Sequence, residues 1–183
     1  MNRLRVFAGI LICLLVVSFV SQAENKFVGA KKCMACHKTE KLGGLAYTVW
    51  EKSKHAKAYQ TLLGEEAKKI AKEKGLKVAP SEAPECLKCH VAGGGIAKNV
   101  DATFKKEEGV TCESCHGAAS GFVAIHSKKD EASKKKAMEA GLVKLEKNEK
   151  LCVTCHNSES PSFKGFKFAE MWAKIEHGKP AKK

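Results

Sequence analysis

Four copies of the pattern Cys-x-x-Cys-His recur along the chain, at residues 33–37, 86–90, 112–116 and 152–156, and we number them motif 1 to motif 4. In c-type haem attachment, two thiols spaced in this way bond the vinyl groups of a porphyrin, and the adjacent histidine becomes the proximal ligand of the iron. His supplies only 7 of the 183 residues, so chance does not explain a histidine after every cysteine pair. The pattern predicts four haem c groups, each with its iron.

The predicted attachment and proximal-ligand residues are Cys33, Cys36 and His37; Cys86, Cys89 and His90; Cys112, Cys115 and His116; and Cys152, Cys155 and His156. The alternatives are a disulfide framework of eight cysteines, or two zinc sites with Cys₂His₂ or Cys₄ ligation. Neither requires a histidine after each pair, and a disulfide framework usually spreads its cysteines along the chain. The spacing therefore favours haem.

Each proximal histidine leaves one axial position on the opposite face of its iron. A second histidine there gives a six-coordinate, low-spin electron-transfer centre, whereas Met raises the potential and an empty position admits a small ligand. Three histidines lie outside the motifs, His55, His126 and His177, and we predict each as a distal ligand. Because three histidines cannot serve four irons, the fourth position is left to Met138, Met171, a lysine or no protein group. An open iron is the first choice.

The elements that position these ligands are predicted to be helices joined by long loops, with no strand. The pattern indicates a helix over residues 42–63, with His55 on one face beside Tyr59 and Leu62. Shorter helices are expected over 65–74, stopped by Gly75, and over 130–147, broken or ended near Gly141. A last helix is expected to carry Phe166, Ala173 and His177 on one stripe and to end at Gly178 and Pro180.

The mature chain, residues 24–183, has the length of one domain. Four haems leave about 40 residues for each, too few to wrap every porphyrin separately. We therefore expect a mainly α, compact single-domain tetrahaem cytochrome whose haems pack near one another. Long loops would be supported by haem, which would supply much of the buried apolar surface.

The N-terminus has the features of a secretory signal peptide. Arg3 and Arg5 precede an apolar run over residues 6–20, and small residues lead to a cleavage site after Ala23. A retained anchor helix is the alternative, but the run is shorter than the roughly 20 residues that span a membrane. We expect residues 1–23 to be cleaved as the leader, which removes Cys13, and the product to be periplasmic.

The chain is strongly basic, with a formal net charge of +13 that falls to +11 when the leader takes away Arg3 and Arg5. Two Lys-dense stretches, residues 65–77 and 128–150, carry most of the excess. They are either solvated helices or a docking face for an acidic redox partner, whose association rate the charge would raise. Nucleic acid is not an expected partner of an exported protein.

With motifs and spare histidines in view, the chain resembles the tetrahaem cytochrome c-554 family over nearly all of its mature length. The stretches that carry the resemblance are residues 50–56, 85–90, 109–117 and 172–178. The resemblance implies a mostly helical periplasmic electron shuttle with three bis-histidine haems and one five-coordinate haem, best known downstream of hydroxylamine oxidation. It also implies that His126 shares an iron with His37, His177 with His116, and His55 with His156, which leaves His90 alone. After His90 the family commonly has a polar residue, Gly and an aromatic, whereas this chain has residues 91–95 as Val-Ala-Gly-Gly-Gly.

The leading functional hypothesis is an electron-transfer protein, in which the polypeptide fixes the spacing of the haems and tunes each iron. The rival is an enzyme that reduces or binds a small nitrogen oxide at the haem held by His90. A third class, a subunit that wires a larger membrane-bound redox complex, has a similar sequence. No catalytic residue can be nominated, because every histidine is already assigned to iron.

Overall fold

The computed structural model describes residues 24–95, 97–128 and 130–177. The leader and the terminating pair Gly178 and Pro180 lie outside the described residues. The α-helices are α1 (Lys31–His37), α2 (Glu40–Gly43), α3 (Ala46–Lys52), α4 (Ala58–Thr61), α5 (Glu65–Glu73), α6 (Pro84–His90), α7 (Glu113–His116), α8 (Glu131–Glu139) and α9 (Phe168–Ile175). The 3₁₀ turns are η1 (His55–Lys57), η2 (Ala92–Gly95), η3 (Ala97–Asn99), η4 (Lys106–Glu108), η5 (Ala119–Gly121) and η6 (Cys152–Thr154).

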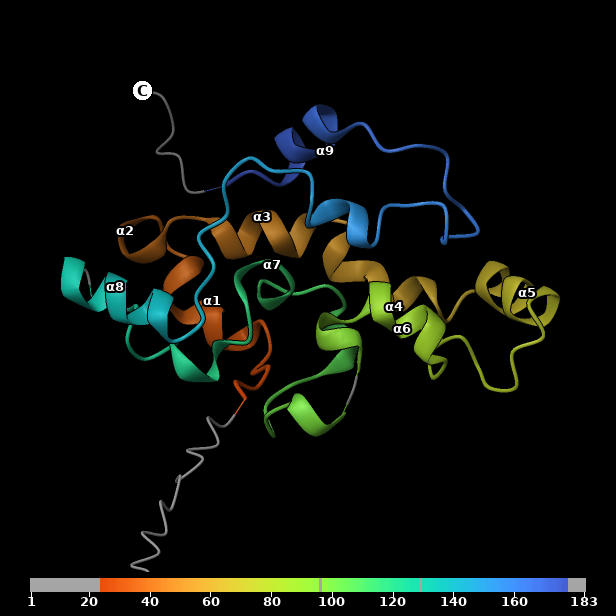
Figure 1. Cartoon of the computed structure of the whole chain (residues 1–183), viewed down its shortest axis with the longest axis horizontal. Coiled ribbons are helices and arrows are strands. Elements are labelled where there is room, and N and C mark those ends of the chain that lie inside the picture. Colours follow the sequence, from red (N-terminus) through yellow and green to blue (C-terminus); the bar gives the residue numbers. More distant parts are fainter. Residues whose placement is uncertain (1–23, 96, 129, 178–183) are drawn as a thin grey trace, which may run out of the picture.

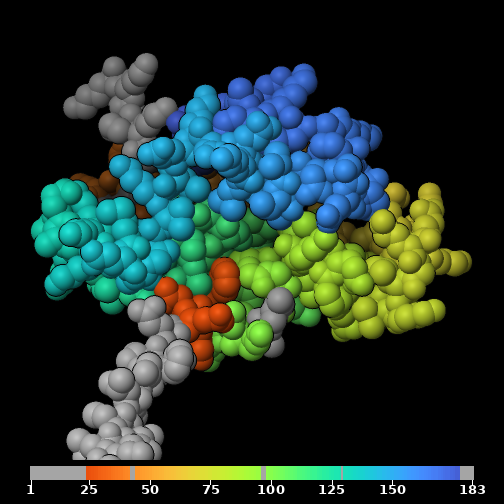
Figure 2. All heavy atoms as spheres, viewed as in Figure 1, coloured from red at the N-terminus to blue at the C-terminus, as the bar shows by residue number. Residues whose placement is uncertain are grey.

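The helices are short and joined by long loops, so the predicted mainly α class is confirmed. Helices α5 and α8 lie at opposite ends of the molecule, with α3, α6 and α7 between them (Figure 1). The C-terminal segment with α9, blue in both views, runs along the upper side of the molecule and covers the upper part of the face seen in Figure 2. Among the described residues the only β-type pairing is an isolated parallel bridge between Phe27 and Val100.

Helix α5 begins and ends where its sequence signals predict. Glu65 and Glu66 occupy the first turn, where carboxylates oppose the positive end of the helix dipole. At the other end Gly75 has a φ of 67° and donates its N–H to Lys72 O at 3.0 Å, while Leu76 N donates to Ala71 O at 2.9 Å. This is the paired C-terminal bonding of a Schellman motif, so the predicted stop at Gly75 is confirmed.

Helix α8 ends near Gly141, as predicted. The Asp130 side chain accepts a hydrogen bond from Ser133 N at 2.8 Å and caps the start, and Gly141, with a φ of 102°, ends the helix. The helix does not resume after this glycine, since residues 142–147 are not helical. Val143 N donates to His116 O at 2.9 Å, and this contact draws the chain toward motif 3 instead.

The long helix predicted over residues 42–63 is wrong. The chain forms α2, α3, η1 and α4 there, and Ser53 is extended with a ψ of 165°. Beyond the break, the carbonyl oxygen of His55 accepts a hydrogen bond from Val110 N at 3.0 Å, in addition to that from Ala58 N within the turn. His55 therefore opens a new 3₁₀ turn and does not share one continuous helix with Tyr59 and Leu62.

The last helix is also shorter than predicted. α9 ends at Ile175, and Glu176 has left the helical region with a ψ of 130°. His177 therefore lies two residues beyond the helix, not on the predicted stripe. Its Nδ1 atom donates to Ile175 O at 2.8 Å, which fixes the ring against the helix end.

The polypeptide core is thin, as the composition predicts. One cluster of buried side chains contains Val28, Ala119, Phe122 and Ala137, and the other contains Tyr59, Leu62, Leu87 and Val91. Several large apolar side chains near the motifs are exposed to more than a third of their surface, among them Met34, Leu151 and Val153. Separately, none of the helices in the described part of the chain is long and apolar enough to cross a membrane.

Candidate haem-binding centre

Each motif winds into a helical turn that brings its two thiols and its imidazole together. Motif 1 lies in α1, motif 2 ends α6, motif 3 begins one residue before α7, and motif 4 begins η6. In motifs 3 and 4 the histidine N–H donates to the carbonyl of the first cysteine at 2.9 Å, as His116 does to Cys112 and His156 to Cys152. Pro84 at the first position of α6 fits the start of a helix, where no backbone partner is needed.

Thiols of different motifs lie next to one another. Cys33 of motif 1 and Cys112 of motif 3 lie close enough to shift each other's pKa, and Cys155 of motif 4 acts in the same way on Cys89 of motif 2. Cys115 of motif 3 in turn lies within electrostatic range of both thiols of motif 4. The contacts therefore order the four motifs in space as 1, 3, 4, 2.

These surroundings raise the pKa of most of the thiols. The contact with Cys112 and burial raise the pKa of Cys33 far above its usual range. Burial, together with neighbouring thiols, raises the pKa of Cys89 to about 11 and that of Cys115 to about 11. These thiols are neutral at physiological pH.

The structure brings each spare histidine against the histidine of a motif. The ring centroids are 6.0 Å apart for His37 and His126, for His55 and His156, and for His116 and His177. The ring planes differ: the first pair is parallel within 5°, whereas the other two are inclined by 56° and 61°. All seven histidines are among the described residues, and His90 has no second histidine ring against it.

The spacing of these pairs suits a shared metal ion. An iron between two imidazoles needs a metal–nitrogen bond of about 2 Å on each side, and with the half-width of each ring this requires centroids roughly 6 Å apart. The three observed pairs have that separation, so the residues present fit the irons of three haems. The same pairs are those that the family resemblance implies.

Backbone carbonyls hold the imidazoles in one tautomer. Nδ1 of His90 donates to Ala58 O at 2.8 Å, and Nδ1 of His116 donates to Val143 O at 3.0 Å. His126 and His177 make the same kind of bond, to Val123 O at 3.1 Å and to Ile175 O at 2.8 Å. Because a carbonyl can only accept, Nδ1 carries a proton, and Nε2 is the nitrogen that is available to bind a metal ion.

The neutral form of several imidazoles is favoured by their surroundings. Burial and the nearby His156 lower the pKa of His55. Burial also lowers the pKa of His116, although the bond to Val143 acts in the opposite direction, and it lowers the pKa of His156. A neutral imidazole is the form that binds iron.

Two glycines allow the close approaches that place these ligands. Gly109 has a φ of 70°, and a Cβ atom there would lie 2.7 Å from His55 O. Gly117 has a φ of 88°, and a Cβ atom there would lie 2.5 Å from Gly141 O. Only glycine fits these positions, because each combines a left-handed backbone with a neighbouring carbonyl.

His90 has a different environment from the other motif histidines. Thr61 Oγ1 lies 3.1 Å from its Nδ1, and the same hydroxyl donates to Ala58 O at 2.7 Å. The methionines considered for the fourth iron lie elsewhere: Met138 is exposed on α8, at the far end of the molecule from α6 (Figure 1). Met171 is exposed on α9, with its sulfur 3.8 Å from Lys174 Nζ.

Comparison with known proteins points to one family. A family model described as "Cytochrome c554 and c-prime" matches residues 30–117, a range that contains motifs 1 to 3 and His55. A cytochrome c-554 from Nitrosomonas europaea is 33% identical over 158 residues, which cover 79% of this chain and 64% of the relative. Both matches support a cytochrome of the c-554 family. No solved structure matches it significantly.

Membership of a cytochrome c family implies covalently bound haem c with its iron as the cofactor. The described part of this c-554-family chain has no disulfide and no group of three His, Cys, Asp or Glu side chains arranged to hold a metal ion. The chain spans 64% of the length of the curated relative.

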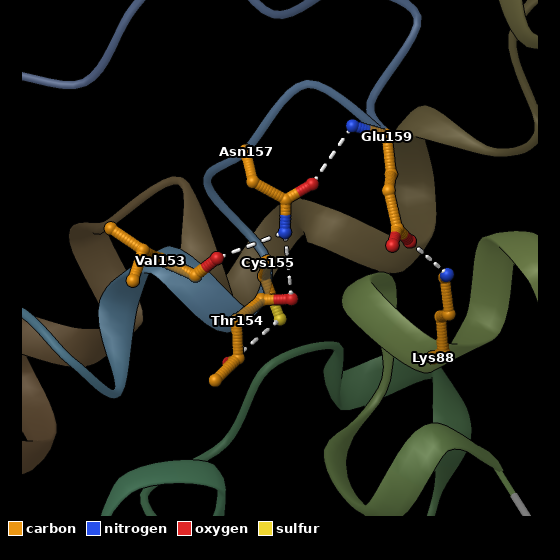
Figure 3. A network of polar contacts seen from close by, with 6 residues as sticks. All are labelled: Lys88, Val153, Thr154, Cys155, Asn157 and Glu159. Carbon is orange, nitrogen blue, oxygen red and sulfur yellow. Dashed lines mark hydrogen bonds and ion pairs between the residues drawn. The ribbon is translucent and has the colours of Figure 1, made fainter.

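A polar network joins motifs 2 and 4 at the surface (Figure 3). Lys88 of motif 2 forms an ion pair with Glu159, in the loop that follows motif 4. Asn157 organises that loop: its amide donates to Val153 O at 2.9 Å and Thr154 O at 3.1 Å, and its side-chain oxygen accepts from Glu159 N. The mutual attraction raises the pKa of Lys88 and lowers that of Glu159.

Sequence reasoning missed some groups that organise the centre. The carbonyls of Ala58 and Val143 carry no signal, because every residue has one. Phe166, whose ring stacks on His156 at 4.7 Å and 18°, was recognised only as an apolar position. Glu113 could have been singled out from the sequence. It is a carboxylate between the two cysteines of motif 3, a place where burial is expected.

Proposed function

We propose that this chain is a periplasmic electron-transfer protein with four covalently attached c-type haems. In this proposal motifs 1 to 4 each hold one haem through two thioether bonds, after a leader over residues 1–23 has directed export. Haem c supplies one-electron transfer at its iron. The observation that carries the proposal is the set of three imidazole pairs, each with centroids 6.0 Å apart and each joining a motif to a distant part of the chain.

The proposed ligation is bis-histidine for three irons, through His37 with His126, His55 with His156 and His116 with His177. His90 then holds the fourth iron alone, with its other axial position open. The Nδ1 bond from His90 to Ala58 O orients the proximal ring and increases the basicity of its ligating nitrogen. The chain's part is thus to fix four ligand sets and to keep three of them closed to small molecules.

The proposed order of the haems is 1, 3, 4, 2, and it is supported by the contacts between thiols. Cys33 lies against Cys112, Cys115 lies near Cys152 and Cys155, and Cys155 lies against Cys89. A thioether joins each porphyrin at its edge, so neighbouring thiols bring porphyrin edges close together. Such an arrangement suits stepwise electron transfer, with the His90 haem at one end.

An acidic or membrane-associated redox protein is the proposed partner. The support comes from the basic end of one Lys-dense stretch and not from the two stretches together. The two Lys-dense stretches do not form one face, because α5 and α8 lie at opposite ends of the molecule (Figure 1). Ion pairs within each helix, such as Lys68 with Glu65 and Lys134 with Glu131, also neutralise part of α5 and α8. Lys74, next to the end of α5, acts electrostatically on Cys86, so the basic end of α5 adjoins motif 2.

The second candidate function is a reductase or binder of a small nitrogen oxide at the haem of His90. The observation that favours it is the absence of a second imidazole at His90, the only histidine not paired with another in the described residues. No residue is nominated as a proton donor for such a reaction.

One comparison separates the two functions. The reduced holoprotein is mixed with nitric oxide, nitrite or hydroxylamine, and separately with an oxidised periplasmic redox protein. A carrier is expected to be oxidised rapidly by the protein partner and to show no sustained turnover of the small molecules. Sustained turnover that cyanide or carbon monoxide inhibits would establish the enzyme and contradict the carrier. Co-purification of the cleaved protein with membranes would indicate instead a subunit of a membrane redox complex.

A further inference from the structure

The carboxylate of Glu113 is buried at the junction of motifs 1 and 3. Glu113 is only 3% exposed, although it stands between the two cysteines of motif 3. One carboxylate oxygen accepts hydrogen bonds from Val28 N at 2.8 Å and Ala119 N at 2.9 Å, and the other accepts from Gly29 N at 2.8 Å. Burial raises the pKa of Glu113 above its usual range, and the three backbone N–H donors act in the opposite direction because they favour the charged form. With both oxygens facing N–H donors and no acceptor for a carboxyl proton, the geometry suits an ionised carboxylate at neutral pH.

A second carboxylate binds the same stretch of backbone. Glu108 accepts a hydrogen bond from Ala30 N at 2.7 Å, so three successive N–H groups, of residues 28–30, point at two acidic side chains. Glu108 is half-buried and lies within electrostatic range of Glu113. Backbone dipoles stabilise the two charges, and no ion pair to either carboxylate is found within the described residues.

Both acidic groups act on the thiols at which two haems would be attached. Glu113 and Glu108 each lie within electrostatic range of Cys33 in motif 1 and Cys112 in motif 3. Around motif 2 the charges are balanced: Glu85 and Lys74 act on Cys86 with opposite signs, and so do Glu159 and Lys88 on Cys89. The charge near motifs 1 and 3 is therefore negative and buried, whereas near motif 2 it is mixed and exposed.

We propose that Glu113, assisted by Glu108, lowers the reduction potentials of the haems held by motifs 1 and 3. This inference rests on the proposed electron-transfer function. A fixed negative charge stabilises the oxidised, more positive iron, and burial protects that effect from screening by salt. The haems of motifs 4 and 2 would then have the higher reduction potentials. Electrons on the protein would reside mainly on these haems, one of which is held by His90.

The expected effect follows from the interaction of one charge with one iron. At a separation of roughly 10 Å and an effective dielectric constant near 20, a unit charge changes a one-electron equilibrium by about tenfold. Removal of the Glu113 charge should therefore raise the ratio of reduced to oxidised iron at a fixed potential by about tenfold. This corresponds to a potential shift of about 59 mV for a one-electron couple.

The experiment is a redox titration of the holoprotein, followed by electron paramagnetic resonance, for Glu113→Gln, Glu113→Asp and Glu108→Gln. Bis-imidazole irons with parallel rings give rhombic signals and those with crossed rings give strongly anisotropic signals. The 5° angle between His37 and His126 therefore identifies the haem of motif 1. Glu85→Gln is the matched control, because Glu85 also adjoins a haem cysteine but is exposed.

Glu113→Gln is expected to raise the potential of the rhombic signal and of one of the two anisotropic signals, with the other unmoved. Glu108→Gln should shift the same two signals in the same direction. Glu113→Asp disturbs the hydrogen bonds as much but keeps the charge, so its potentials should stay near those of the original protein. Glu85→Gln should leave both signals unmoved.

Equal shifts in the Asp and Gln variants would show that Glu113 acts only through structure and would overturn the proposal, as would no shift in Glu113→Gln. Where Glu113→Gln fails to take up haem, the comparison uses Glu108→Gln, which removes a charge, and Glu113→Asp, which keeps one. The proposal then requires a rise in the two potentials in Glu108→Gln and none in Glu113→Asp. The outcome is distinct from failure of the proposed function. That failure would be seen in the unmutated protein, as a lack of low-spin signals.

Discussion

Replacement of His126 by Ala should convert one haem of four from low-spin to high-spin. Nδ1 of His126 is held by Val123 O at 3.1 Å, and its ring faces that of His37 at 6.0 Å. Ala has no group that could reach an iron from that position. The number of low-spin irons should therefore fall from three to two in each chain, and the number of high-spin irons should rise from one to two.

The ring angles make this prediction specific to one signal. Because His37 and His126 are parallel within 5°, the variant should lose the rhombic component of the paramagnetic resonance spectrum and keep both strongly anisotropic components. His177→Ala is the matched control: its pair is inclined by 61°, so it should lose an anisotropic component and keep the rhombic one. Each loss should amount to about one quarter of the total iron.

The assay is spin quantification of the oxidised protein, with haem content measured on the same sample. Four haems per chain in both variants would show that the covalent attachment is intact. An unchanged rhombic signal in His126→Ala would refute the ligand role of His126. Loss of an anisotropic signal instead would refute the pairing with His37.

Three further predictions concern the protein around the haems. Gly109→Ala should lower the free energy of unfolding by at least about 1 kcal/mol more than Gly75→Ala. Both positions have a left-handed φ, but only at Gly109 would the new Cβ atom meet a carbonyl, that of His55 at 2.7 Å. Denaturant unfolding of the two holoproteins measures the difference in stability. Equal losses of stability would refute the close approach at Gly109. Lys88→Met should leave the melting temperature of the holoprotein unchanged, because its ion pair with Glu159 is exposed and screened by salt, and a marked fall would contradict this. The chain produced without haem attachment should show no cooperative unfolding transition in circular dichroism, because the two buried clusters of the polypeptide are small; a sharp transition would show that they suffice.

Features with a local cause could be predicted from the sequence more readily than the path of the chain. The attachment motifs depend on a few adjacent residues, so their spacing could be recognised directly. The helix end at Gly75 could also be predicted, because the glycine and the turn before it supply all the bonds that end α5. These features share a local cause.

The wrong helix predictions have the opposite cause, contacts with distant motifs. The helix over residues 42–63 breaks at Ser53, and His55 O then accepts a bond from Val110, two residues before motif 3. Of the two outcomes predicted for residues 130–147, a break or an end near Gly141, the chain takes the end, since Val143 exchanges two hydrogen bonds with His116. In both places a long-range contact outweighs a helical preference that the sequence does contain.

Mössbauer spectroscopy of the mature, iron-57-enriched protein counts irons by spin state and so tests the proposed ligation most directly. We expect four haem irons in each chain, three low-spin and one high-spin, with the high-spin iron bound by His90. Four low-spin irons would contradict the open position at His90. Fewer than four haem irons would contradict the role of the motifs themselves.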